Sequence, residues 1–430
     1  MRPNKVWLAA LIFLSSLPLL PAQSQAYWVY FRYKGTADLG PALGLQSLER
    51  RQQYGIDLDS LDYPVNPIFL DRLEATGGTV KVTSRWQNAA LVLADSLPSN
   101  WFKASFIENI EPLGTHPSPP VLAPRLWVEW GGPLKFPKGT RRKVQKQESL
   151  LNTQGIQAKA EYGRGLSIAV LDVGFRGWNQ HLALAEANVR STWDFLRQDT
   201  TVDQNGFHGT QVLSVLAAQH IGICPEAEYH LFRTELESEE FPAEMYYWIA
   251  ALEKADSLGV DLVCSSLGYN TFDPPNFSLQ KEEFDGKTLA ISLAAETALT
   301  RGMMVVVSAG NEGKNDWQII TAPADSYGVV AGGALTRSGK QVPFSSQAPS
   351  FMPHPIVYAV GKKVVVTSWH PGKYRLASGT SYAAPQLAGW LACLLKIRPD
   401  WSPSELQKQL FKQVEQSAQG IPDFQALINY

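Results

Sequence analysis

The sequence contains few cysteines, and none of them lies in a metal-binding pattern. Its 430 residues include only Cys224, Cys264 and Cys393, all within apolar stretches. An odd number of cysteines allows at most one intrachain disulfide and leaves one thiol over. None has the CxxC or histidine spacing of a zinc site. We therefore expect buried free thiols, no metal site and no cofactor for the chemistry.

A strong net charge is also absent. The formal net charge is −2, and 45% of the residues are hydrophobic against 18% charged, as in a soluble globular protein with a sizeable core. Nucleic-acid-binding domains usually carry a basic patch. The basic cluster Arg141-Arg142-Lys143 is too short to form one, so we expect no nucleic-acid partner.

Long apolar segments are missing as well. The run Val6–Leu20 is short for a bilayer span and follows a positively charged start. Ser24-Gln25-Ala26 places small residues where a signal peptidase needs them. We predict a signal peptide over residues 1–26, cleavage before Tyr27, and secretion to the medium or a periplasm with no membrane span left.

Residues 27–112 have the pattern of a small α+β domain. Trp28–Tyr33 is dense in strand formers, and Asn66-Pro67 suits the start of a helix. Further strands are predicted around Val80 and Val82, over Asn88–Ala94 and from Phe106, with a short helix from Pro98. This β-α-β-β-α-β order is that of a ferredoxin-like domain.

Residues 113–148 differ in composition from their neighbours. Repeated prolines, among them Pro124, Pro133 and Pro137, oppose regular structure. We expect an exposed Pro-rich linker here that contains a processing region, because exposed linkers are where proteolysis concentrates.

Residues 149–430 alternate between apolar strands and helices. The strands have no polar alternation, which is typical of parallel sheets buried on both faces. Strands are predicted at Leu166–Leu171, Tyr229–Phe232, Val260–Cys264 and Met303–Val307, and helices at Gln211–Ala218, Leu289–Thr300 and Ser381–Ile397. This alternation predicts an α/β fold with a doubly wound, mostly parallel sheet.

Four polar residues lie where such a sheet places its ligand crevice, beyond the carboxyl ends of strands. Asp172 and Asn311 follow strands, while His208 and Ser381 precede helices. Taken alone, each has an ordinary structural alternative: a cap, a turn residue or a structural histidine. Together they supply a nucleophile, a base, a group that orients the base, and an oxyanion donor.

The segments around these residues resemble the signature segments of the subtilisin-like serine peptidases (subtilases, family S8). They are Ile168-Ala-Val-Leu-Asp-Val-Gly174, His208-Gly-Thr210, Ser308-Ala-Gly-Asn311 and Gly379-Thr-Ser-Tyr-Ala-Ala-Pro385. The order Asp, His, Ser separates the pattern from α/β-hydrolases and from trypsin-like enzymes. The resemblance covers roughly residues 150–415.

The resemblance implies a role for each residue in an acyl-enzyme mechanism. Ser381 would attack the scissile carbonyl, and His208 would accept its proton. Asp172 would orient His208, and Asn311 would bind the oxyanion with the Ser381 backbone N–H. The implied function is a secreted serine endopeptidase that acts on proteins or peptides.

The resemblance also implies two substrate-binding segments. Ser266, Leu267 and Gly268 would pair with an extended substrate, and Ala309 with Gly310 would form part of the first specificity pocket. Ordinary turns at strand ends remain the alternative for both.

The sequence departs from the family at three points. Val173 replaces the usual Ser or Thr after the aspartate, which removes a hydroxyl near Asp172. Gln347–Tyr358 lacks the family pattern, so we predict an altered surface loop. No calcium-loop pattern is recognisable, which leaves structural calcium unsupported.

Residues 27–112 resemble the propeptide of the family more weakly. This implies that the chain's own propeptide acts as an intramolecular inhibitor and folding aid. We expect a monomeric active form that starts between about residues 140 and 155. Two alternatives remain, a non-catalytic binding or scaffold protein with this fold and an esterase; motif order disfavours the esterase.

Overall fold

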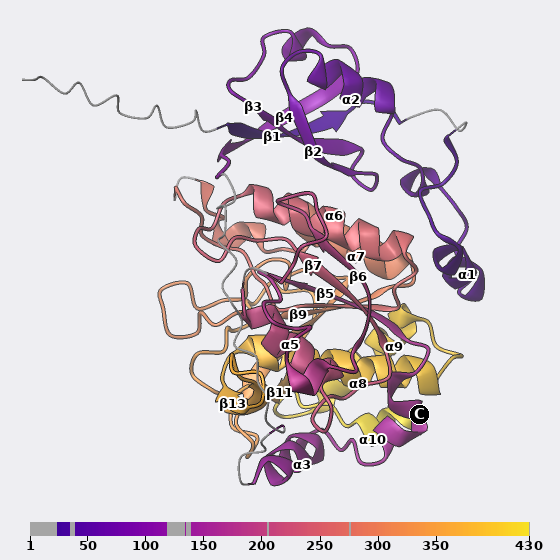
Figure 1. Ribbon diagram of the computed structural model, residues 1–430, viewed down its shortest axis with the longest axis vertical. Helices are drawn as coiled ribbons and strands as arrows, with labels where there is room; N and C mark the ends of the chain where they lie inside the picture. The colour runs from indigo at the N-terminus through magenta and orange to yellow at the C-terminus, as the bar shows by residue number, and fades with distance from the viewer. Residues whose placement is uncertain are drawn as a thin grey trace, which may run out of the picture.

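The computed structural model describes residues 24–34, 39–117, 134, 139–203, 206–274 and 277–429. A small antiparallel sheet domain is stacked on a larger α/β domain (Figure 1). The predicted fold class, a mostly parallel α/β sheet preceded by a small α+β domain, is confirmed. The predicted signal peptide lies outside the described residues up to residue 23.

The N-terminal domain is a four-stranded sheet with the strand order β2-β3-β1-β4. All of its strand pairs are antiparallel. Its elements are β1 (Gln25–Phe31), α1 (Leu45–Gln53), α2 (Pro67–Glu74), β2 (Thr79–Ser84), β3 (Ala89–Ala94) and β4 (Ile107–Thr115).

Two elements of this domain differ from the prediction. The segment after Pro98 forms only a 3-10 turn, Trp101–Lys103, because β4 begins at Ile107 and leaves room for a single turn. Helix α1 was not predicted, since its buried residues are polar: Ser47, Arg50 and Arg51.

Strand β1 starts two residues before the predicted signal cleavage at Tyr27. Ala26 is buried and pairs with Leu93 of β3 and Gly114 of β4. A cut before Tyr27 would therefore remove the first two residues of the strand. The cleavage site itself stays a prediction.

The expectation that residues 113–148 lack regular structure is wrong at both ends. Strand β4 continues to Thr115, and helix α3 (Thr140–Leu150) begins three residues after Pro137, the last proline of the segment. Arg141 and Arg142 are exposed on α3, which packs against β11 (Val357–Val360) and β12 (Val364–Thr367) of the larger domain. Residues 118–133 and 135–138 lie outside the described residues.

The larger domain is built on a seven-stranded sheet with the order β11-β10-β9-β8-β5-β7-β6. Every neighbouring pair in this sheet is parallel. The strands are β5 (Ser167–Asp172), β6 (Asn188–Asp194), β7 (Glu228–Arg233), β8 (Leu262–Ser265), β9 (Met304–Ser308), β10 (Val329–Leu335) and β11 (Val357–Val360). A hairpin of β12 (Val364–Thr367) and β13 (Tyr374–Ala377) follows.

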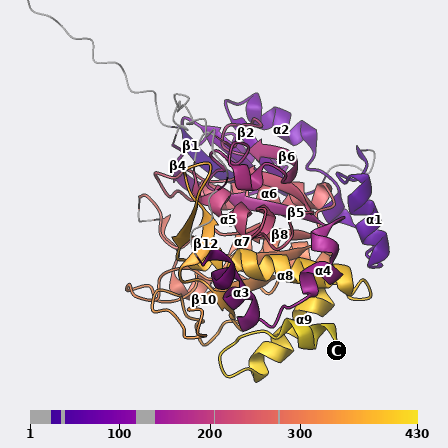
Figure 2. The same ribbon diagram turned by 60° about the horizontal axis from the view of Figure 1, so that its bottom comes forward.

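Helices cover both faces of this sheet. Helices α6 and α7 pack on the face toward the N-terminal domain, and α5 and α8 on the other (Figures 1 and 2). The helices are α4 (Ile156–Lys159), α5 (His208–Ala217), α6 (Ala243–Ser257), α7 (Ala290–Thr300), α8 (Ala384–Ile397), α9 (Pro403–Gln416) and α10 (Phe424–Ile428).

The two faces explain why the central strands carry no polar alternation. In β5, Ile168 and Val170 belong to the core on the α5 and α8 side, whereas Ala169 and Leu171 belong to the core beneath α6 and α7. All four are fully buried. Successive side chains of a strand point to opposite faces, so both sets must be apolar.

The N-terminal domain lies against α6 through an apolar contact and a cluster of buried charges. The rings of Trp28 and Tyr246 are 4.4 Å apart between centroids. Asp256, at the end of α6, accepts hydrogen bonds from the guanidinium groups of Arg50, Arg51 and Arg85. We call these four residues the interface ion cluster.

Three further expectations concern cysteine, metals and membrane spans. All three cysteines are buried and free, as predicted; the sulfur atoms of Cys224 and Cys393 lie 3.7 Å apart. Across the described residues, no group of His, Cys, Asp and Glu side chains is arranged to hold a metal ion. None of the described helices combines the length and apolar character needed to cross a membrane.

Candidate active site

The predicted site residues gather at the carboxyl edge of the parallel sheet. Asp172 is the last residue of β5, and Asn311 lies three residues beyond β9. His208 is the first residue of α5, one turn earlier than predicted. Ser381 lies in the 3-10 turn Thr380–Tyr382 that precedes α8. Parallel strands end on one side of a sheet, which is why residues distant in sequence meet here.

Asp172 and His208 are joined by a two-pronged contact. The Nδ1 atom of His208 lies 2.9 Å from Oδ1 and 3.0 Å from Oδ2 of Asp172. The backbone N–H of Val173 also donates to Asp172 Oδ1, at 2.9 Å. Residue 173 thus contacts the carboxylate through its backbone, although the valine side chain carries no hydroxyl. This contact fixes the ring orientation and leaves Nε2 for the pocket.

Two opposing effects set the pKa of His208. Burial lowers it, but the negative charge and hydrogen bond of Asp172, with a contribution from Glu237, outweigh burial and raise the pKa above its ordinary value. The Asp172 side chain has no exposed surface, whereas that of His208 is 31% exposed. A buried carboxylate thus stabilises the protonated form of an imidazole that solvent and substrate can reach.

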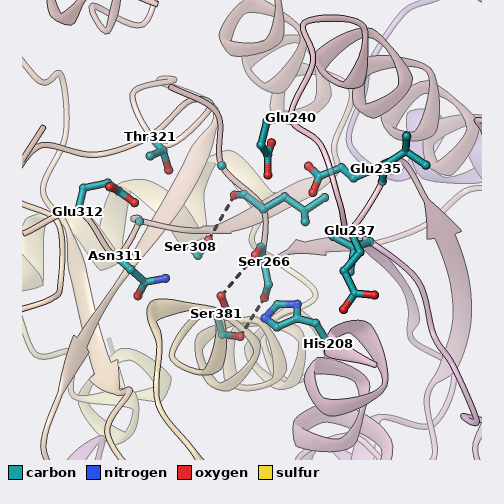
Figure 3. Close-up of a pocket in the computed structure, with 15 residues that line it drawn as sticks. His208, Glu235, Glu237, Glu240, Ser266, Ser308, Asn311, Glu312, Thr321 and Ser381 are labelled. Carbon is teal, nitrogen blue, oxygen red and sulfur yellow. Dashed lines mark hydrogen bonds between the residues drawn. The ribbon is translucent and has the colours of Figure 1, made fainter. Parts of the chain in front are cut away.

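Ser381 faces the same pocket as His208 (Figure 3). Its Oγ donates to the carbonyl of Ser266 at 3.4 Å, and the Ser266 hydroxyl donates back to the Ser381 carbonyl at 2.9 Å. The 3.4 Å contact is long for an O–H···O bond. The nucleophile candidate is therefore held only loosely, beside the free side of the imidazole.

Asn311 is oriented by its carboxamide oxygen. This oxygen accepts from the backbone N–H and the hydroxyl of Thr380, at 2.9 and 3.2 Å. The amide nitrogen consequently points the other way, toward the Ser381 side of the pocket (Figure 3). An N–H donor is thus aimed beside the candidate nucleophile.

His208, Asn311 and Ser381 line a pocket of about 320 Å³, and Asp172 lies buried behind His208. Of the predicted substrate segments, Ser266, Leu267, Gly268 and Gly310 line it. Ala309 does not; it is fully buried in the core beneath α6 and α7.

Sequence reasoning missed several residues of this pocket. Glu235, Glu237, Glu240, Glu312 and Thr321 also line it. A signal for the first three was available, because the acidic run from residue 235 to 240 directly follows the strand β7 and so must emerge at the carboxyl edge of the sheet. Thr321 had no such signal.

Comparison with sequence families gives two matches that divide the chain where the structure does. A model described as the subtilase family of peptidases (Peptidase S8) matches residues 163–426. A model described as the peptidase S8 propeptide domain of Bacteroidota matches residues 26–118. Together the two matches cover the seven-stranded sheet and the four-stranded sheet.

Individual relatives are similar over the larger domain. Subtilisin E of Bacillus subtilis is 28% identical over 271 residues, which are 61% of this chain and 64% of that protein, so the chain spans less than two thirds of its length. Subtilisin Savinase of Lederbergia lenta is 28% identical over 267 residues, 59% of this chain and 87% of that protein. The prenylagaramide maturation protease PagA superposes with a TM-score of 0.50 at 21% identity, covering 64% of this chain and 98% of that one, a likeness of fold.

Proposed function

The chain belongs to the subtilase family, and from that premise we propose that it is a secreted serine endopeptidase that acts through Asp172, His208 and Ser381. The observation that carries the proposal is the Asp172–His208 contact directed at a pocket whose wall contains Ser381. A serine hydroxyl is a weak nucleophile unless an oriented base removes its proton.

The proposed reaction proceeds in two halves. A small rotation of the Ser381 side chain, which its 3.4 Å contact permits, would bring Oγ to Nε2 of His208 when substrate enters. Ser381 attacks the scissile carbonyl while Nε2 accepts the hydroxyl proton and then passes it to the leaving amine. Water hydrolyses the acyl-enzyme by the same steps in reverse, and Asp172 stabilises the charged imidazole throughout.

The substrate chain would lie along the segment Ser266–Gly268. The backbone N–H and carbonyl of Gly268 have no hydrogen-bond partner within the described part of the chain. A free backbone edge can pair with an extended peptide and place its carbonyl over Ser381.

Asn311 would donate to the oxyanion that forms during attack. We expect Asn311→Ala to lower kcat about 10²–10³-fold with little change in KM, because this donor acts on charge that develops only in the transition state. Steady-state kinetics on a fluorogenic peptide measures both constants. The exposed Asn179, outside the pocket, is the matched control. A kcat that falls no more in Asn311→Ala than in Asn179→Ala would contradict the assignment.

The pH dependence of kcat/KM follows from the raised pKa of His208. The base must be neutral, so activity is lost as pH falls through this pKa, and we expect the acid limb to lie above about pH 6.5, the ordinary histidine value. Glu237→Gln removes one of the charges that raise the pKa and should move the limb to lower pH. Glu239→Gln should leave it in place, and a limb that is the same in all three proteins argues against this electrostatic account.

The N-terminal domain would serve as propeptide and inhibitor. His116 follows β4 and packs edge-on against Phe241, whose neighbour Glu240 lines the pocket. The last described residues of the domain thus lie against the loop that contributes Glu240 to the pocket. Removal of this domain would release a monomeric enzyme into the medium or the periplasm.

A fluorophosphonate probe tests the central proposal. The probe should label the processed wild-type chain and fail to label Ser381→Ala. Digestion of casein, compared with hydrolysis of short-chain nitrophenyl esters, separates a peptidase from an esterase. Absence of labelling in a folded, processed wild-type chain would favour a non-catalytic binding protein instead.

A further inference from the structure

The pocket beside Ser381 has an unusual charge. Glu235, Glu237, Glu240 and Glu312 all line it, and its lining contains no lysine or arginine. We call this set of four the acidic pocket. Figure 3 shows Glu235 and Glu237 on one side of Ser266, Glu312 on the other, and Glu240 between them. The chain as a whole is nearly neutral, so the concentration of carboxyl groups belongs to this site.

Within the described residues the acidic pocket has no ion-pair partner, although the charge of Arg233 acts on Glu235 and that of Glu237 on His208. None of its four carboxylates forms a salt bridge with a described lysine, arginine or histidine. Arg233, which precedes the loop, is directed elsewhere, since it donates to Asp194 Oδ2 at 2.6 Å and to the Val173 carbonyl at 2.9 Å. Burial, followed by the charge of Glu240, raises the pKa of Glu235, which is 5% exposed. Burial also raises the pKa of Glu240 to about 7. An incoming cation would therefore favour the ionised form of both carboxyl groups.

The loop after β7, which carries Glu235, Glu237 and Glu240, is stabilised by hydrogen bonds to a residue of α6. Glu244 on α6 accepts from the backbone N–H of Leu236 at 2.8 Å and from that of Phe241 at 3.2 Å. These two donors lie near the two ends of the acidic run. Glu244 is fully buried, so the loop is organised before any substrate arrives.

An unpaired hydroxyl in the same pocket gives an independent indication of a ligand. Thr321 is 3% exposed, and its Oγ1 has no hydrogen-bond partner within the described part of the chain. Thr321 lines the pocket between Gly268 and Gly310. A Cβ atom added to Gly268 would lie 2.0 Å from Thr321 Oγ1, and one added to Gly310 would lie 3.1 Å from it, so the two glycines leave room for this hydroxyl. Buried hydroxyls are almost always paired, so this acceptor suits a donor brought by the substrate.

We propose that the acidic pocket selects polypeptides that carry a lysine or arginine side chain next to the scissile bond, with Glu235 and Glu240 as its charge partners. Ammonium and guanidinium groups offer three and five N–H donors and no acceptor, which matches a lining of carboxylates and a free hydroxyl. The inference rests on the proposed peptidase function and names its substrate class.

The test uses pairs of fluorogenic peptides that differ only in lysine versus methionine, with the lysine moved through each position before the scissile bond. The processed wild-type enzyme should show a kcat/KM ratio of lysine to methionine of about 10–100 when the lysine lies next to the scissile bond. Glu235→Gln and Glu240→Gln should each lower this ratio several-fold, and the double variant should lower it to near one.

Glu239→Gln is the matched control, because Glu239 lies on the same loop, is exposed and does not line the pocket. Fluorophosphonate labelling of each variant checks that the nucleophile is intact. A wild-type enzyme that cleaves methionine peptides as well as lysine peptides overturns this inference and leaves the peptidase function standing. If no peptide is cleaved and Ser381 is not labelled, the peptidase function fails and the inference fails with it.

Discussion

The Ser381→Ala chain is expected to accumulate as an uncut precursor and to hydrolyse peptides on the order of 10⁶-fold more slowly than wild type. Both effects have one cause. If the chain cuts its own linker, removal of the nucleophile stops processing and substrate turnover together. Residual activity would come from the oxyanion donors and from substrate binding alone.

Gel electrophoresis and N-terminal sequencing of the secreted protein measure the first effect. We expect a wild-type N-terminus between about residues 140 and 155, within or just after α3, and an uncut chain for Ser381→Ala. Ser404→Ala, an exposed serine at the start of α9, is the control and should be processed normally. A fully active wild-type protein that starts at Tyr27 would contradict the propeptide assignment.

Replacement of Asp256 is expected to have the second largest effect. It should weaken the binding of the N-terminal domain to the catalytic domain. This buried carboxylate is the common partner of Arg50, Arg51 and Arg85, and the side chains involved are almost inaccessible to solvent. Asp256→Ala would leave buried guanidinium groups short of a counter-charge. Breaking one side of such a cluster typically costs about 3–5 kcal/mol, which corresponds to a 10²–10³-fold or greater loss of affinity.

This effect is measured on the complex that the N-terminal fragment forms with the catalytic domain after the linker has been cut. After processing, the N-terminal fragment should co-elute with the wild-type catalytic domain in gel filtration and separate from the Asp256→Ala domain. Asp400→Ala is the charge-matched control, because the Asp400–Arg398 pair is on the surface, where ion pairs contribute little. Equal retention of the fragment in both variants would mean that apolar contacts such as Trp28–Tyr246 hold the interface without the ion cluster.

Helix α1 illustrates why part of the fold escaped prediction. Its sequence lacks an apolar stripe, and the residues it buries include Arg50 and Arg51. An amphipathic pattern reveals a helix only when its buried face is apolar. Here the face is neutralised by Asp256, about two hundred residues away, so no local window of sequence contains the reason for the helix.

The candidate site was predictable to a greater degree. Asp172, His208, Asn311 and Ser381 could be chosen because each adjoins a recognisable strand or helix, and parallel strands bring their carboxyl ends to one edge. The directions in which the side chains of the site point could not be predicted in this way. That Gly310 faces the pocket while Ala309 faces the core depends on local backbone geometry beyond β9.

The sequence by itself determined the central strands and main helices of the larger domain, the parallel architecture and the residues at the strand ends, because apolar patterning and turn chemistry act over a few neighbours. Only the tertiary structure decided the two-pronged Asp172–His208 contact, the direction of the Asn311 amide and the charge of the pocket. The acidic loop after β7 meets Glu312 and Thr321 across more than seventy residues of chain. Contacts between segments so far apart in the sequence depend on the order of the strands in the sheet. That order is determined by the packing of the whole domain.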